Sequence, residues 1–178
     1  EPADAGELGE LPDGWAWVSI AQVGLVLQNG IAKRIGEQGM PYPVLRLVDF
    51  KDGLLLKIER RSISLLKDEI MKYSLGANDL LLTRVNGSKD IAGVLVFPNI
   101  TSTAFCDHFI RVKTTESLVP KFLLYSSRDE KFRKQVERNL VTSAGQHTIS
   151  QQGFESVDFP LPSLPEQAEI VRRVDELF

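Results

Sequence analysis

Residues 78–97, NDLLLTRVNGSKDIAGVLVF, hold two short apolar runs separated by a polar segment. The runs at 80–82 and 94–97 have the length and the aliphatic content of buried strands. Between them, VNGSKD places Gly87 among polar side chains, a composition typical of a turn. This stretch therefore predicts two buried strands joined by a polar loop.

The flanking sequence adds further short strands and then a helix. Residues 42–56 are apolar from Val44 to Leu47 and turn at Asp52 and Gly53, which predicts a hairpin, and residues 104–115 predict one more strand. At about residue 119 the apolar period changes from two to about 3.6, so we expect one helix over 120–139 followed by a polar loop. The pattern predicts an α+β fold with a curved, mostly antiparallel sheet and a few helices.

The bulk composition is that of one globular domain. Of 178 residues, 43% are hydrophobic and 25% charged, so neither disorder nor a membrane protein is indicated. The single cysteine, Cys106, cannot form an internal disulfide, which favours a cytoplasmic protein and gives no basis for a cysteine-based metal site. Because the sequence does not begin with methionine, we expect a fragment or a processed chain.

Charge is segregated along the chain. The net charge is −3, but residues 15–154 carry 19 basic and 13 acidic side chains, while both ends are acidic. A moderately basic body is compatible with binding to a phosphate backbone. An ordinary mixed surface explains the same numbers equally well.

The sequence lacks the motifs of an enzyme. His108 and His147 are its two histidines, with no HExxH motif and no cysteine partner, so no metal site is expected. There is no GxSxG elbow, no phosphate-binding GxxxxGK[ST] loop and no glycine-rich turn of a dinucleotide or S-adenosylmethionine fold. A non-catalytic binding module is the better expectation.

Three polar loops are candidate binding surfaces, at residues 31–39, 83–93 and 142–150. Arg, Asn and Gln can hydrogen-bond to base edges, while Ser and Lys suit phosphates. An ordinary solvated loop is the alternative in each case, and the basic face of the helix expected at 120–139 is interpreted as solvated. The candidate DNA contacts are Lys33, Arg34, Arg84, Asn86, Ser88, Lys89, Ser143, Gln146 and His147.

The final segment, PLPSLPEQAEIVRRVDELF at 160–178, predicts the first turns of a helix. Ser163 and Glu166 have the spacing of a capping box. The apolar residues that follow have the four-and-three spacing of a coiled-coil seam, and about two turns of helix are not stable alone. A partner helix or a continuation of the chain is therefore implied. The seam consists of Ile170, Val174 and Leu177, flanked by Val171 and Phe178.

This final segment, with its proline-rich leader, Glu-Gln and Ile-Val, resembles the segment that follows the target recognition domain in specificity subunits of type I restriction-modification enzymes. The resemblance covers residues 11–178, and the order of its blocks is more specific than any one of them. One departure is GANDLLL, where the family usually has Gly directly before Asp, which affects the local turn. The upstream blocks are LPDGWAWVSI, YPVLRLVDFKDG, KYSLGANDLLLTRVNGS, AFCDHFIRV, VPKFLLYSSRDEKFRKQV and SAGQHTIS.

The resemblance implies a DNA-reading subunit without catalysis of its own. In this family two recognition domains each read half of a bipartite site, held apart by paired antiparallel helices that also dock methyltransferase subunits. Those subunits bind S-adenosylmethionine, and a separate restriction (motor) subunit uses ATP, so no cofactor is expected in this chain. The expected partners are double-stranded DNA, both kinds of subunit, and a second recognition domain in the same chain or a homodimer through the spacer helix, in the bacterial or archaeal cytoplasm.

We therefore expect an acidic, poorly ordered leader at 1–10, a target recognition domain at 11–162 and the start of a spacer helix at 163–178. Two other interpretations stay open. The chain could be the recognition domain of a single-chain DNA methyltransferase or restriction enzyme, which an Asn-Pro-Pro-Tyr motif in the flanking sequence would favour. It could also be a protein-interaction module, which weak salt dependence of any DNA binding would favour.

Overall fold

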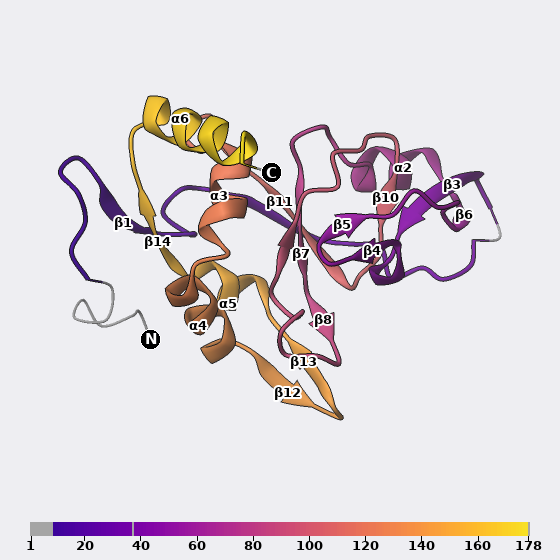
Figure 1. Ribbon diagram of the computed structural model, residues 1–178. Helices are drawn as coiled ribbons and strands as arrows, with labels where there is room; N and C mark the ends of the chain where they lie inside the picture. The colour runs from indigo at the N-terminus through magenta and orange to yellow at the C-terminus, as the bar shows by residue number, and fades with distance from the viewer. Residues whose placement is uncertain (1–8, 37, 178) are drawn as a thin grey trace.

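The structure, a computed structural model, describes residues 9–36 and 38–177. It centres on a four-stranded antiparallel sheet in the order β2-β11-β7-β9, of which β7 and β11 are labelled in Figure 1. Residues 1–8 of the predicted acidic leader, and Phe178 of the predicted seam, lie outside the described residues. The strands of the central sheet are β2 (Val26–Asn29), β7 (Leu80–Thr83), β9 (Leu95–Val96) and β11 (Phe109–Lys113).

Strand β7 explains why the central sheet is covered on both faces. Leu80 and Leu82 belong to one hydrophobic core, whereas Leu81 belongs to a second core on the opposite face. Successive side chains of a strand point to opposite faces, so an unbroken leucine run needs partners on both sides. Leu82 pairs with Leu95 of β9 in antiparallel register. The two buried strands predicted from residues 78–97 are confirmed.

Helices and a two-stranded sheet cover the first face of the central sheet. Phe132 of α4 and Phe154 of α5 meet edge to face there, with ring centroids 6.3 Å apart. The single helix predicted over 120–139 is wrong, because Asp129 accepts hydrogen bonds from the backbone N of Lys131 and Phe132 and starts a second helix. The elements are α3 (Pro120–Ser126), α4 (Glu130–Arg138), α5 (Gln151–Glu155) and the pair β1 (Ala16–Ser19) with β14 (Asp158–Leu161).

A smaller mixed sheet in the order β10-β3-β6 and helix α2 cover the second face. The hairpin predicted within 42–56 is present as β4 and β5, and its turn residues Asp52 and Gly53 both have positive φ, 53° and 78°. These elements are β3 (Met40–Leu45), β6 (Ser62–Leu65), β10 (Ala104–Phe105), α2 (Lys67–Tyr73), the 3-10 turn η1 (Leu47–Asp49), β4 (Phe50–Lys51) and β5 (Leu54–Leu55).

The strand predicted over 104–115 is broken at its middle. β10 ends at Phe105, a turn follows in which Phe109 N donates to Cys106 O at 3.0 Å, and β11 begins at Phe109. The break has a tertiary cause, since Ile31 forms a parallel bridge with Cys106. Gly30 permits this approach, because a Cβ there would lie 2.1 Å from the carbonyl oxygen of Cys106.

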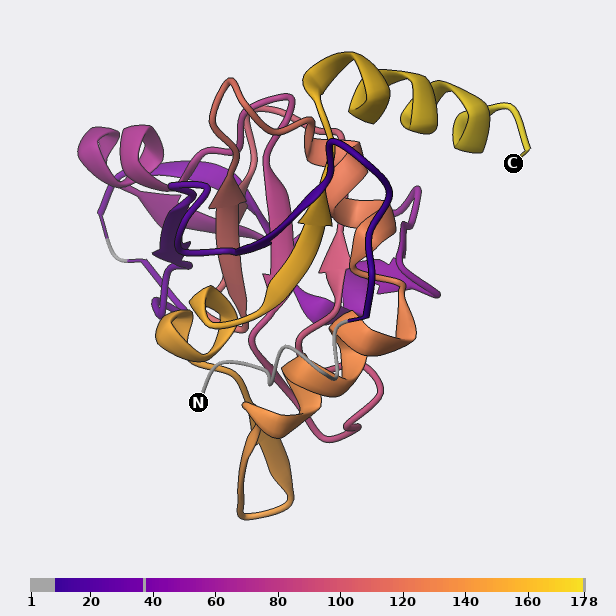
Figure 2. The ribbon, with the colours of Figure 1, turned by 90° about the vertical axis from the view of Figure 1, so that its left-hand side faces the viewer.

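A third sheet, in the order β12-β13-β8, stands apart from the body of the domain. The polar loop predicted over 140–150 is wrong, because its residues form a hairpin that projects from the body (Figure 2). Ala144 and Gly145 make its turn with φ of 48° and 74°, the conformation of a tight two-residue hairpin loop. The strands are β8 (Val85–Asn86), β12 (Val141–Ser143) and β13 (Gln146–Thr148). The α+β class with antiparallel sheets and few helices is confirmed, although the strands of the described residues form five separate sheets.

Helix α6 (Leu164–Asp175) packs on α3 at the end of the domain opposite the β12–β13 hairpin (Figures 1 and 2). The predicted capping box is present, since Ser163 N donates to the Glu166 carboxylate at 3.3 Å. Ile170 and Val171 pack against the first core, whereas Leu177 is 77% exposed. Part of the predicted seam therefore contacts this domain itself. None of the described helices is long and apolar enough to cross a membrane.

Candidate nucleic-acid interface

The β12–β13 hairpin and β8 bring two of the predicted loops together. His147 of β13 lies opposite Asn86 of β8, and Ser143 of β12 lies opposite Gln146 of β13. Residues from 83–93 and from 142–150 thus occupy one three-stranded sheet, which we call the ribbon (β8, β12 and β13). Four of the nine candidate contacts lie in it, and Arg84, Ser88 and Lys89 flank it.

The tip of the ribbon is open to solvent. Residues 141–146 are all exposed, including Ser143 and Gln146. His147 is half-buried, and its Nδ1 lies 2.9 Å from Thr142 Oγ1 across the hairpin. A two-stranded hairpin such as β12–β13 fits the major groove of B-DNA, which is about 12 Å wide. The exposed tip can therefore present side-chain amides and hydroxyls to base edges.

The loop after β8 is held by its own polar side chains. Asn86 Oδ1 accepts a hydrogen bond from Ser88 N at 2.8 Å, and Ser88 Oγ accepts one from Asp90 N at 3.3 Å. Lys89 Nζ lies 2.7 Å from the Glu137 carboxylate of α4 and lowers the pKa of Glu137. Ser88 and Lys89 thus fix the loop, while the amide nitrogen of Asn86 stays uncommitted among the described residues.

The third predicted loop joins this region through Asp107. Arg34 donates two hydrogen bonds to the Asp107 carboxylate, at 2.8 and 3.3 Å, which raises the pKa of Arg34. Arg84 Nη1 donates to the carbonyl oxygen of Asp107 at 3.3 Å. Lys33 instead pairs with Glu69 of α2 at 2.9 Å. All three loops therefore adjoin, although Lys33 and Arg34 are already paired with carboxylates.

The basic side chains of the 120–139 segment are not all solvated. Arg128 donates to the carbonyl oxygen of Leu95 at 3.0 Å, and Arg133 donates to that of Gly93 at 2.9 Å. Burial lowers the pKa of both arginines. These two side chains satisfy backbone groups around β9, so they belong to the packing of α4 on the sheet and not to a free basic surface.

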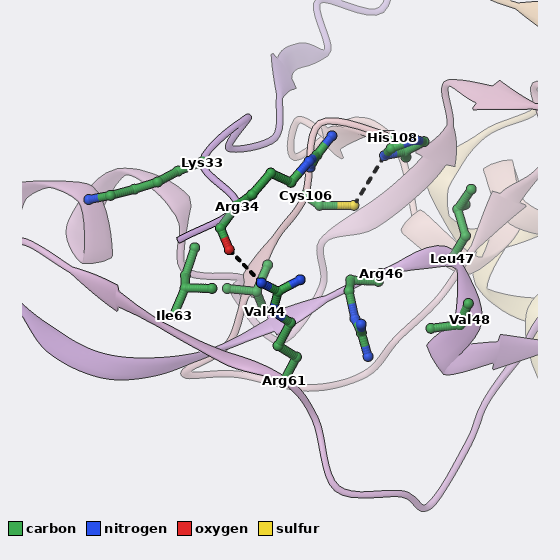
Figure 3. Close-up of a pocket in the computed structure, with 10 residues that line it drawn as sticks. All are labelled: Lys33, Arg34, Val44, Arg46, Leu47, Val48, Arg61, Ile63, Cys106 and His108. Carbon is green, nitrogen blue, oxygen red and sulfur yellow. Dashed lines mark hydrogen bonds between the residues drawn. The ribbon is translucent and has the colours of Figure 1, made fainter. Parts of the chain in front are cut away.

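Sequence reasoning missed Arg46 and Arg61, which line a cavity of about 330 Å³ beside His108 (Figure 3). Arg61 donates to the carbonyl oxygen of Arg34 at 2.6 Å, which closes one side of the cavity. Arg46 interrupts the apolar run 44–48, and Arg61 belongs to a double arginine. An arginine inside a strand-forming run was the available signal, but only the fold brings the two together.

Cys106, Asp107 and His108 offer ligand atoms within 4.8 Å of one another, a grouping that could hold a metal ion. His108 therefore has a cysteine neighbour that the sequence analysis discounted. Two features oppose metal binding: Arg34 occupies the Asp107 carboxylate, and burial raises the pKa of the Cys106 thiol, which disfavours the thiolate that metals bind. The cluster is better explained as part of the turn that joins β10 to β11.

Comparison with known proteins identifies homologues. The chain is 42% identical over 168 residues to the specificity subunit of the type I restriction enzyme StySPI of Salmonella potsdam, covering 93% of this chain and 36% of that protein. The chain's homologues are type I restriction enzyme specificity subunits. A second, the EcoKI subunit of Escherichia coli K12, is 31% identical over 155 residues, covering 85% and 33%. This chain spans about a third of the length of these specificity subunits and covers one domain of them.

Solved structures show the same fold. A chain from the type I R-M system, in a structure concerned with complex assembly and conformational transition, matches 99% of this chain and 40% of its own length, with a TM-score of 0.68 and 20% identity. The HsdS subunit from Thermoanaerobacter tengcongensis matches 94% and 38%, with a TM-score of 0.62 and 22% identity. No protein-family model matches. The resemblance found in the sequence to specificity subunits is confirmed.

Proposed function

We propose that this chain is a target recognition domain that reads a short DNA sequence for a type I restriction-modification enzyme and catalyses no reaction itself. Homology to specificity subunits supports the role. The observation that carries the proposal is the pairing of β8 with β13, which places Asn86 beside His147 and joins candidate contacts from two loops in one ribbon.

The chemistry of the ribbon suits base reading. Asn and Gln side chains can hydrogen-bond bidentately to adenine, and Ser can bond to either a base edge or a phosphate. Gln146 is exposed and the amide nitrogen of Asn86 has no acceptor among the described residues, so both can donate to a ligand. Arg84 directly precedes β8, so its positive charge favours a phosphate backbone beside the ribbon, whereas the Asp107 carboxylate offsets the charge of Arg34.

The position of α6 supports the proposed assembly. Gln167 is 1% exposed and joins α6 to the segment before α3, so the start of the helix is held against the rest of the domain. We infer a recognition domain at 11–162 and a spacer that begins at residue 163. A continued spacer would hold a second recognition domain, in the same chain or in a homodimer, at a fixed distance along DNA. Methyltransferase subunits with S-adenosylmethionine and an ATP-using restriction subunit are the proposed partners, in the cytoplasm.

The single-chain methyltransferase or restriction enzyme is not favoured, because the matched relatives are specificity subunits. The protein-interaction module is the remaining alternative, and it predicts that changes in the ribbon leave the modified DNA motif unchanged.

The test is to express the full-length protein that contains this chain with its methyltransferase subunits and to map the modified sites in the host genome. Gln146→Ala should relax one position of the motif or reduce cognate binding roughly 5- to 150-fold, which corresponds to about 1–3 kcal/mol per bidentate contact. Gln152→Ala, on the exposed side of α5, is the matched control and should change neither. A wild-type motif and affinity in the Gln146→Ala complex would refute the proposed reading surface.

A further inference from the structure

The cavity beside His108 is lined by basic side chains and by no acidic side chain. Four cationic side chains border it, and none of its lining residues is Asp or Glu (Figure 3). Its volume of about 330 Å³ is within the range of ligand sites. An anionic group is therefore the ligand that the cavity favours. The cationic lining consists of Lys33, Arg34, Arg46 and Arg61.

Two of the four cations are available to a ligand. Lys33 and Arg34 pair with Glu69 and Asp107 at 2.9 and 2.8 Å, which offsets their charge. Arg61 has no carboxylate within ion-pair distance among the described residues, and its bond to the carbonyl oxygen of Arg34 leaves its charge uncompensated.

Arg46 is also only loosely paired. Its closest carboxylate oxygen, Asp49 Oδ1, is 3.8 Å from Nη2, too long for a hydrogen bond. Its Nε has no hydrogen-bond partner in the described part of the chain. Arg46 and Arg61 thus supply the attraction for an anion.

Most of the remaining lining is aliphatic, and Cys106 and His108 complete it. Val44 and Ile63 are buried in the floor, and Val48 is 65% exposed at the rim. A cationic wall facing an apolar one matches a sugar–phosphate unit, in which a charged phosphate is attached to a largely apolar deoxyribose ring. Inorganic phosphate alone would leave the apolar wall without a partner.

The cavity adjoins the ribbon. His108 lines it, and the carbonyl oxygen of His108 accepts a hydrogen bond at 2.7 Å from the backbone N of Arg84, two residues before Asn86. A DNA strand read by the ribbon can therefore reach the cavity with its backbone. We propose, resting on the function proposed above, that the cavity binds one sugar–phosphate unit of the DNA backbone through Arg46 and Arg61. This contact positions the duplex against the ribbon without reading a base.

A backbone contact has a different signature from base reading. Replacing Arg46 and Arg61 by Gln should weaken cognate and non-cognate binding by the same factor, about tenfold. It should also lower the slope of log affinity against log salt concentration by about one for one lost phosphate contact. Lys67→Gln with Lys72→Gln on α2 removes the same charge from an exposed helix and is the matched control, expected to change affinity much less.

The decisive experiment uses the full-length protein with its methyltransferase subunits and duplexes in which single phosphates are replaced in turn by neutral methylphosphonates. Replacement of one particular phosphate should weaken wild-type binding about tenfold. The same replacement should not further weaken binding by the Arg46→Gln, Arg61→Gln variant. Arg61→Gln alone, an exposed change, should show the same coupling if the double variant folds poorly.

Two outcomes would overturn the inference. In the first, the wild-type complex discriminates its motif from a scrambled duplex, but no methylphosphonate linkage has an effect that depends on Arg61. This outcome would leave the proposed function intact. The second is Arg61-dependent binding of free deoxyadenosine monophosphate without any coupled linkage, which would make the cavity a site for a small nucleotide. Failure of the wild-type complex to discriminate its motif at all would remove the proposed function together with this inference.

Discussion

His147 of β13 and Asn86 of β8 are direct antiparallel partners, although they lie 61 positions apart in the sequence. Each contributes to a different polar loop of the sequence, and their pairing turns two loops into one ribbon. Because side chains alternate along a strand, a slip of one residue would move every ribbon side chain to the opposite face. The set of groups that the ribbon exposes therefore depends on this register, and on the register within the hairpin, which the short turn between β12 and β13 fixes.

The first prediction separates base reading at Asn86 from its structural role. Asn86→Asp keeps the oxygen that accepts from Ser88 N, so the turn after β8 should persist and the thermal midpoint should be nearly unchanged. The variant cannot donate to adenine and brings a negative charge to the phosphates. Cognate DNA binding by the full complex should fall roughly 5- to 150-fold, the equivalent of about 1–3 kcal/mol for one bidentate contact.

Asn99→Asp is the matched control for that change. Asn99 is exposed, adopts positive φ (47°) and lies in the loop after β9, so Asp is tolerated there and adds the same charge. Its DNA affinity should stay within about twofold of wild type, a change of less than 0.5 kcal/mol. Equal losses in both variants would assign the effect to net charge and would remove Asn86 from the reading surface.

The second prediction concerns the turn of the ribbon. Gly145 has φ of 74° and an added Cβ there would meet nothing within 4 Å, so Gly145→Ala strains only the backbone. Gly14 has φ of 83° and equally open surroundings near β1, which makes Gly14→Ala a matched control. Each should lower the free energy of unfolding by about 1 kcal/mol. Only Gly145→Ala should change DNA affinity, measured by titration of the full complex with cognate duplex. An unchanged affinity in Gly145→Ala would argue against the ribbon as the DNA-reading surface.

Local sequence was sufficient where a residue's structure depends on its immediate neighbours. The leucine run 80–82 could only be a strand buried on both faces, and Ser163 with Glu166 satisfies its own helix start. Solvated elements were harder to recognise. The β12–β13 hairpin has neither an apolar alternation nor an Asn-Gly turn, and it uses Ala144 at positive φ, a conformation that a non-glycine residue rarely adopts.

Features that depend on contacts between distant segments could not be predicted from local patterns. The break between β10 and β11 follows from the bridge of Ile31 to Cys106, which no alternation in 104–115 reveals. The side chain of Arg128 points inward because it donates a hydrogen bond to the carbonyl oxygen of Leu95. The basic cavity likewise joins side chains from four separate segments of the chain, so its chemistry becomes visible only in the folded protein.

The third prediction is a shifted titration at the contact of α3 with α6. Tyr125 donates its hydroxyl hydrogen to the Asp175 carboxylate. Burial is the larger cause and the Asp175 carboxylate the smaller cause that together raise the pKa of Tyr125 to about 12. Because the folded pKa lies above the ordinary value of 10, this contact contributes fully below pH 10 and is lost as pH rises towards 12.

Asp175→Asn tests the cause of that shift. The pKa of Tyr125 should fall but stay above 10, because burial is the larger cause. Glu176→Gln removes the same charge one residue along, where the carboxylate pairs with Arg172, and should leave the tyrosine unaffected. An NMR titration of labelled tyrosine measures each value. A wild-type pKa near the ordinary value would show that the contact does not form in solution.

The fourth prediction concerns Gln167, which holds α6, the proposed start of the spacer, against the segment before α3. Its side chain accepts from Val119 N at 2.9 Å and donates to the carbonyl oxygens of Ser117 and Pro162 at 3.2 and 3.0 Å. Gln167→Ala would leave these buried groups without partners, at a cost of roughly 1–3 kcal/mol each for those that water cannot reach.

Hydrogen exchange by mass spectrometry on the full complex should then show faster exchange in α6 and in the first turn of α3, with no change in β7 and β11, whose core contacts remain. Ala168→Ser, at the exposed neighbouring position, should leave exchange at wild-type rates. Because the ribbon lies at the other end of the domain, Gln167→Ala should keep the same bases in the modified motif while lowering the yield of modification, since the proposed spacer would no longer hold two half-sites at a fixed distance. Unchanged exchange in α6 would mean that Ile170 and Val171 alone anchor the helix.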